Sequence, residues 1–416
     1  MKREEKKEFM DFLKKSPTSF HAIEQLSKKL LANSFIELDE TKPFNLEYQK
    51  RYFLKKNGAL IAFCTPKKKI KKAVFCLSHT DSPGFKIKKQ PQKSLNQFEL
   101  VGLEIYGAPL IYTWVNQALY PAGIVYTESQ KKLSSELVEF PELKSMIPPL
   151  AIHLDREVNQ KGAIFNKQND INPIFSSSFP FMNILEEKFS SPILDFDLFL
   201  VPEHPQEIFG QDEEFLASYR IDNLSSVYPS LKALINTPCH ETQLGVCLFF
   251  DHEEIGSRTL EGADSSFFEE TFKRICFSLE GDSFENFLQI KAESLALSID
   301  VAHGVHPHHP NKHDMEAPPY LGKGPVIKYS ASKKYATDAY ASAYLRMIGK
   351  DLPLQSFYPH GEIGSGSTVG PIFSSKAGIR TIDIGIAILG MHAMKEILSF
   401  KDLYYLQELL EKIFTH

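Results

Sequence analysis

Residues 249–257 read Phe-Phe-Asp-His-Glu-Glu-Ile-Gly-Ser, so an apolar run ends in two adjacent glutamates and a glycine. The run from Leu244 to Phe250 predicts a short buried strand. Open α/β sheets bind ligands at the carboxyl ends of their strands, where Glu253 and Glu254 would then lie. Because successive residues of an extended chain point to opposite sides, one carboxylate could hold a metal while the other faces a water or substrate. Taken alone, such a pair is more often a solvated acidic loop, and the rest of the chain decides.

The composition is that of an ordinary globular protein. The 416 residues are 43% hydrophobic and 24% charged, which suffices for two domains with one inserted in the other. A net charge of −5 indicates neither nucleic-acid binding nor an acidic tail. No apolar stretch approaches the roughly 20 residues that span a membrane, and the N-terminus is too charged for a signal peptide. The five scattered cysteines favour free thiols, so we expect a cytoplasmic protein.

Periodicity predicts a mixed α/β sheet with helices on both faces, interrupted by a mostly β insert. The insert, residues 92–204, has short β-prone pieces between Pro, Gly and Asn turns and shows no catalytic spacing. The other domain is then discontinuous, formed by residues 1–91 and 205–416. The expected helices are 4–14, 19–32 (capped by Ser19), 335–347 and 401–414; the expected strands are 51–54, 59–64, 73–77, 244–250, 294–299 and 381–386, with 98–103, 110–114, 123–126 and 193–200 in the insert.

A histidine also follows a predicted strand, in the segment Ser-His-Thr-Asp at 78–81. His79 at a strand end could bind a metal, and Asp81 could fix its tautomer and raise its basicity. The alternative is a simple turn, since Asp81, Pro83 and Gly84 all favour turns.

Two aspartates and a second histidine lie in comparable places. Asp222 begins a predicted helix, where the alternative role is an N-cap. Asp300 ends the predicted strand 294–299, and His392 follows the last predicted strand. The histidines between 306 and 313 are better explained as part of an exposed polar loop.

Together these candidates form a set of carboxylates and imidazoles with one glutamate to spare. Such ligands suit Zn²⁺, Mn²⁺ or Co²⁺. They are too many for one open tetrahedral site and suit two metals that share a carboxylate. Two metals roughly 3.5–4 Å apart bind an attacking hydroxide and polarise a carbonyl together, and Glu253 could move the proton from water to a leaving amine. The candidate ligands are His79, Asp222, Glu254, Asp300 and His392.

Short segments spread over most of the chain match one known family, in the family's order. The chain resembles the aspartyl aminopeptidase and vacuolar aminopeptidase I family of dinuclear zinc metalloaminopeptidases. The matching segments are Ser-His-Thr-Asp at 78–81, Arg-Ile-Asp-Asn at 220–223, Asp-His-Glu-Glu-Ile-Gly-Ser at 251–257, Asp-Val-Ala-His-Gly-Val-His-Pro at 300–307, Gly-Pro-Val-Ile-Lys at 324–328, Tyr-Ala-Thr at 335–337, Gly-Ser-Thr-Val-Gly-Pro at 366–371 and Gly-Met-His at 390–392.

The resemblance implies a role for each candidate residue. It assigns a pair of ligands to each of two metals, a bridging aspartate, a catalytic acid/base, an orienting aspartate and several substrate contacts. By position these are His79 and Asp300 for one metal, Glu254 and His392 for the other, Asp222 as the bridge, Glu253 as the acid/base, Asp81 as the orienter of His79, and His303, Lys328 and Tyr335 as substrate contacts.

The resemblance also implies an assembly and an activity. The insert would mediate dimers within a tetrahedral dodecamer, and His153 would reach the site of a neighbouring subunit. Some family members prefer N-terminal Asp or Glu and others neutral residues; the ammonium of Lys328 suits an acidic side chain. We therefore expect a metal-dependent aminopeptidase acting on peptides with a free N-terminus, preferably acidic. The alternatives are a neutral preference, a dinuclear amidase or deacylase, and a non-catalytic scaffold.

Overall fold

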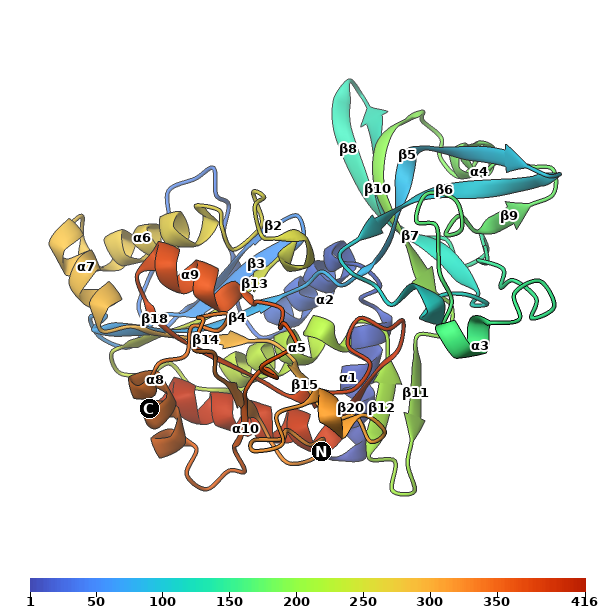
Figure 1. The fold of residues 1–416 in the computed structure, drawn as a ribbon. Coiled ribbons are helices and arrows are strands. Elements are labelled where there is room, and N and C mark those ends of the chain that lie inside the picture. The colour runs from blue at the N-terminus through green and yellow to red at the C-terminus, as the bar shows by residue number, and fades with distance from the viewer.

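The computed structural model describes residues 1–416 and arranges them around two large β-sheets (Figure 1). The larger sheet has nine strands in the order β1-β2-β3-β13-β4-β14-β18-β16-β17. The neighbours from β13 to β18 are parallel, whereas β3 is antiparallel to β2 and β13, and β16 is antiparallel to β18. The strands are β1 (Ile36–Glu37), β2 (Arg51–Lys56), β3 (Ala59–Cys64), β4 (Lys72–His79), β13 (Gln243–Phe250), β14 (Leu295–Ile299), β16 (Val326–Lys328), β17 (Gln355–Phe357) and β18 (Arg380–Gly385).

The parallel strands end at one edge of the sheet. Phe250, the last residue of β13, pairs in register with His79, the last residue of β4. Asp300 follows β14 directly, and its backbone N–H donates to the carbonyl of Ile384 in β18 at 2.9 Å. Segments that are distant in sequence therefore bring their ionisable side chains to the same edge.

Helices cover both faces of this sheet, which confirms the predicted mixed α/β fold. Along β4, Val74 and Cys76 pack into one hydrophobic core while Phe75 and Leu77 pack into another. Figure 1 shows α5, α8 and α10 on one side of the sheet and α6, α7 and α9 on the other. The first core also takes side chains from α1 (Arg3–Lys14), α2 (Ser19–Ala32), α5 (Ile221–Asn236), α8 (Ala339–Ile348) and α10 (Phe400–Thr415), and the second from α6 (Phe267–Glu280), α7 (Phe284–Ala292) and α9 (Val369–Ala377).

A six-stranded antiparallel sheet forms a second unit that projects from the first in Figure 1. It has its own core, which includes Trp114 and Phe181. Its strands all lie between Gly84 and Pro202; the expected boundaries at 92–204 and the dimerisation role stay predictions. In sheet order the strands are β8 (Lys132–Glu139), β7 (Leu119–Ser129), β10 (Ile193–Pro202), β5 (Gly84–Leu95), β6 (Phe98–Tyr106) and β9 (Ile174–Ser176).

Two small sheets border the edge where the parallel strands end. One contains β11 (Gln206–Phe209), β12 (Phe215–Ser218) and β20 (Glu396–Ser399), and the other contains β15 (Ala302–His303) and β19 (Ala387–Ile388). Within the first, Ser218 pairs with Glu396. This pairing brings the start of β20 next to the start of α5, which follows β12 after a short link.

Some local predictions were wrong because nearby hydrogen bonds override the sequence pattern. Residues 110–114 form no strand; Ile111–Thr113 is a 3₁₀ helix. Glu253 and Glu254 are not on an extended chain but begin the 3₁₀ helix Glu253–Ile255. The left-handed backbone of His252, with φ 64°, turns the chain at this point.

One helix, α2, begins at Ser19 as predicted but has a different capping residue, and another helix begins later than expected. Thr18, rather than Ser19, caps α2 by accepting a hydrogen bond from the backbone of His21, while the Ser19 hydroxyl donates to Asp251. The helix expected from residue 335 begins only at Ala339, after its N-cap Asp338. None of the helices combines the length and the apolar character that crossing a lipid bilayer requires.

Candidate metal centre

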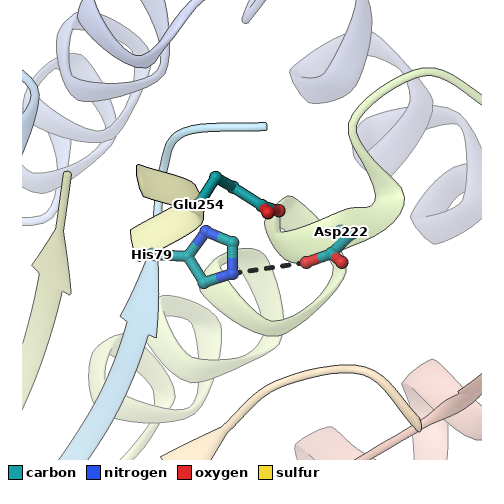
Figure 2. A group of neighbouring side chains, drawn as sticks. All are labelled: His79, Asp222 and Glu254. Carbon is teal, nitrogen blue, oxygen red and sulfur yellow. Dashed lines mark ion pairs between the residues drawn. The ribbon is translucent and has the colours of Figure 1, made fainter. Parts of the chain in front are cut away.

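A cavity of about 420 Å³ opens at the edge where the parallel strands end. His79 ends β4, and Glu253 and Glu254 follow β13. Asp222 reaches the same place from the first turn of α5, as Figure 2 shows for His79, Asp222 and Glu254, whose side chains converge. The lining residues are His79, Ala108, Asp222, Glu253, Glu254, Gly256, Ser257, Asp300, His303, Gly366, Ser367, Thr368, Ile372, Met391 and His392.

The two nitrogens of the buried His79 ring face different partners. Nδ1 lies 3.2 Å from Oδ1 of Asp81, and Nε2 lies 3.3 Å from Oδ1 of Asp222 and 3.6 Å from Oδ1 of Asp300. When Nδ1 donates its proton to the backbone carbonyl of Asp81, at 3.1 Å and beside the Asp81 carboxylate, the Nε2 lone pair is available to a cation. His79 and Asp81 are therefore neighbours, while their roles as metal ligand and orienting group stay predictions.

The carboxylate of Asp222 lies between two histidines. Its Oδ1 faces His79, while its Oδ2 is 3.6 Å from Nε2 of His392. The same His392 nitrogen is 3.5 Å from Oε2 of Glu254. Each oxygen of Asp222 therefore faces a different candidate ligand, as a carboxylate that bridges two ions would.

Asp81 has a wider role than orienting His79. Its Oδ1 accepts the backbone N–H of Glu253 at 3.1 Å, and its Oδ2 accepts that of Glu254 at 3.1 Å. Its Oδ2 also accepts the hydroxyl of Tyr106, at 2.9 Å, from β6 of the second unit. One buried carboxylate thus lies against His79 and also holds the turn that carries Glu253 and Glu254, called here the glutamate turn.

Glu396 is a residue of the site that sequence reasoning missed. It is 2% exposed, and its two carboxylate oxygens accept the backbone N–H groups of Asp222, at 2.8 Å, and His392, at 2.7 Å. It therefore fixes the relative position of two candidate ligands. The only nearby sequence feature that could have pointed to Glu396 is its position four residues after His392. Its other partner, Asp222, is 174 residues away in sequence.

The site concentrates negative charge in a buried place. Although burial opposes its positive charge, the carboxylates of Asp222, Asp300 and Asp81 raise the pKa of His79 well above its usual value. Burial, and then the charge of Asp222, raises the pKa of Glu254 well above its usual value. Repulsion among these carboxylates is relieved by protons, and a bound cation would relieve it in the same way.

The donor set fits divalent metal ions. Ligand atoms of His79, Asp222 and Glu254 all lie within 4.8 Å of one another. In addition, Oδ1 of Asp222 and Oδ1 of Asp300 are buried without a hydrogen-bond partner. Buried carboxylate oxygens without donors are costly unless a cation neutralises them, so these atoms suit metal coordination.

The expected substrate contacts are placed unequally. His303 lines the cavity, but Lys328 and Tyr335 lie in the wall behind it. The Lys328 ammonium is 2% exposed; it donates to the carbonyl of Val301 at 2.9 Å and lies 3.5 Å from Oδ2 of Asp300. His153 lies in an exposed loop of the second unit and not among the residues that line the cavity.

Comparison with known proteins shows the family of the chain. The chain matches the family model described as aminopeptidase I zinc metalloprotease (M18) over residues 12–414. A probable M18 family aminopeptidase 2 from Pseudomonas aeruginosa (strain UCBPP-PA14) is 37% identical over 427 residues, covering 99% of this chain and 98% of the relative.

Solved structures share the fold. In a cryo-EM structure of the Ape4 and Nbr1 complex, the similar chain is 30% identical with a TM-score of 0.92, covering 98% of this chain and 84% of that one. A structure of the S. cerevisiae mApe1 dodecamer, 23% identical, has a TM-score of 0.86 and covers 99% of this chain and 96% of that one. The chain therefore belongs to the aminopeptidase I zinc metalloprotease (M18) family, and its activity is that of a metal-dependent aminopeptidase.

Proposed function

We propose that this aminopeptidase uses two divalent metal ions, preferably zinc, to remove N-terminal Asp or Glu from peptides. The observation that carries the two-ion centre is the Asp222 carboxylate, whose oxygens face His79 and His392 separately. His79 and Asp300 would hold one ion, Glu254 and His392 the other, and Asp222 both. Ions held by these residues would supply an activated water and would polarise the carbonyl of the scissile bond.

Glu253 is the proton carrier of this proposal. It lines the cavity, and its Oε2 lies 4.0 Å from Nε2 of His79. Glu253 is therefore close to the proposed metal ligands but is not itself one of them. Burial raises its pKa to about 8, against the opposing charge of His79. A carboxylate whose pKa lies near the working pH takes a proton from water and returns it to a leaving amine efficiently.

Replacing Glu253 with Gln tests this role. The amide keeps the size of the side chain but cannot carry the proton, so we expect kcat to fall by about 10²–10⁴-fold. Metal content by elemental analysis and the thermal midpoint should stay close to those of the parent. Glu269→Gln, on the exposed face of α6, is the matched control. Near-parental turnover of Glu253→Gln would rule out the proton-carrying role.

The preference for acidic residues rests on Lys328. The Lys328 ammonium lies beside Asp300. Substituting Lys328 therefore changes both the contact with Asp300 and the preference for acidic substrates, and the experiment must separate these two effects. In Lys328→Met, loss of the Asp300 contact should lower kcat/KM for every substrate. The ratio of kcat/KM for N-terminal Asp to that for Leu should fall further, by roughly 10-fold, because the positive charge behind the cavity wall attracts an acidic side chain and losing about 1.4 kcal/mol of that attraction is a tenfold change.

The matched control is Lys323→Met, on an exposed loop of the same region. Equal losses for Asp and Leu peptides in Lys328→Met would indicate a preference for neutral residues instead. A panel of peptides that differ only at the N-terminal residue makes the measurement.

Glu396 is proposed as a positioning residue for the metal ligands. In Glu396→Gln an amide N–H₂ would face one of the two backbone donors, so the Asp222 and His392 segments should separate slightly. We expect zinc affinity, measured by competition with a chelator, to fall about 10–100-fold. Excess zinc should restore most of the turnover. Glu207→Gln on exposed β11 should leave zinc affinity unchanged; equal affinities in the two variants would remove Glu396 from the metal centre.

We further propose that the second unit mediates dimers within a tetrahedral dodecamer, in the cytoplasm. The loop that carries His153 exposes Leu150, Ile152 and Leu154, the last at 73%. Apolar side chains gathered on a surface favour a protein partner, and a solved relative is a dodecamer. All five cysteines are free, as in a reducing compartment.

Two substitutions in this loop separate assembly from catalysis. Leu154→Asp should dissociate the particles in mass photometry, because it buries a charge in the contact. His153→Ala should leave the particles intact yet lower turnover by about tenfold or more, if His153 enters the neighbouring site. Leu288→Asp, on α7 of the other unit, is the control. Intact particles with Leu154→Asp would place the contact elsewhere.

A further inference from the structure

A second cavity, of about 170 Å³, lies between the two units. Asp81 forms part of the wall of this second cavity. The second cavity and the metal-centre cavity have no lining residue in common. One side is formed by the start of α2, at Pro17 to Phe20, and another by strands of the six-stranded sheet, through Lys86 and Tyr126. Nothing in the proposed peptide hydrolysis uses this space.

The cavity contains a buried guanidinium without an anionic partner. Arg220 is 4% exposed and donates through Nη2 to the carbonyl of Thr80, while its Nε has no hydrogen-bond partner. Arginine stays charged in proteins and carries five N–H donors. A buried charge that is neither paired nor fully hydrogen-bonded destabilises the fold, so an acceptor is needed here.

None of the carboxylates that line the cavity forms an ion pair with Arg220, and each of them already accepts other donors. Asp251 accepts the Ser19 hydroxyl and the backbone N–H of His252, both at 3.0 Å. The Asp81 carboxylate accepts the backbone N–H groups of Glu253 and Glu254 and the hydroxyl of Tyr106. The remaining pairs are Lys86 with Asp197 at 2.5 Å and Asn57 with Glu261 at 2.6 Å.

We propose that this cavity binds a small carboxylate anion against Arg220. The planar fork of a guanidinium matches the two oxygens of a carboxylate. The start of α2, which adds a partial positive charge and free backbone N–H groups, forms another part of the wall. The volume of about 170 Å³ exceeds what one water requires, roughly 10–15 Å³.

Occupancy of the cavity would act on the metal centre through Arg220. Its guanidinium holds the carbonyl of Thr80, which lies between His79 and Asp81 in the chain. Arg220 also precedes Asp222 by two residues. An anion that satisfies Arg220 therefore steadies both segments that carry these ligands.

Thermal unfolding of the metal-loaded chain in sodium acetate tests the proposal, with sodium gluconate at equal pH and concentration as the control. Gluconate has the same charge but is bulkier. Acetate should raise Tm by roughly 2–4 °C when its concentration is about 100 times its Kd, and gluconate should not. Equal Tm values in the two salts would mean that the cavity holds water only, which overturns the proposal.

Three variants locate the acetate effect. Arg220→Lys keeps the charge but loses the fork, and Tyr126→Trp narrows the cavity from β7, so each should lose most of the acetate shift. Using both keeps the test valid if the arginine variant does not fold. His392→Ala weakens the metal centre, the other place where acetate could bind, and should keep the shift. Loss of the shift in His392→Ala, or its persistence in both cavity variants, overturns the proposal.

Discussion

The carboxylate of Asp81 is the contact on which the site depends. It accepts hydrogen bonds from the backbone of Glu253 and Glu254 and from Tyr106, and its Oδ1 lies 3.2 Å from Nδ1 of His79. These groups come from three separate segments, and together they stabilise the buried carboxylate. The position of the glutamate turn and the direction of the His79 lone pair are consequently set by the same residue.

Sequence reasoning could find the candidate ligands because each follows a local pattern. His79 and Asp300 stand at the ends of apolar strands, and a parallel sheet necessarily brings such ends to one edge. The fold class followed from the same alternation of strands and helices. The position of Glu253 depends on the left-handed turn at His252. The pattern of apolar residues in the sequence does not predict that turn.

The contacts that sequence could not supply are long-range. Glu396 reaches Asp222 because β20 pairs with β12, and the same carboxylate holds His392. The ammonium of Lys328 was expected to face substrate, yet it lies beside Asp300 in the buried wall, a neighbour 28 positions away that no spacing rule selects. Hydrogen bonds of this kind are properties of the packed core and not of any segment.

The second unit reaches into the site at two places. Tyr106 of β6 donates to Asp81, and Nδ1 of His392 lies 3.1 Å from the carbonyl of Ala108, just beyond that strand. The second unit is thus no appendage that could be trimmed or exchanged freely. A chain without it would need other groups to hold Asp81 and His392, so any transplant of this site has to carry the six-stranded sheet with it.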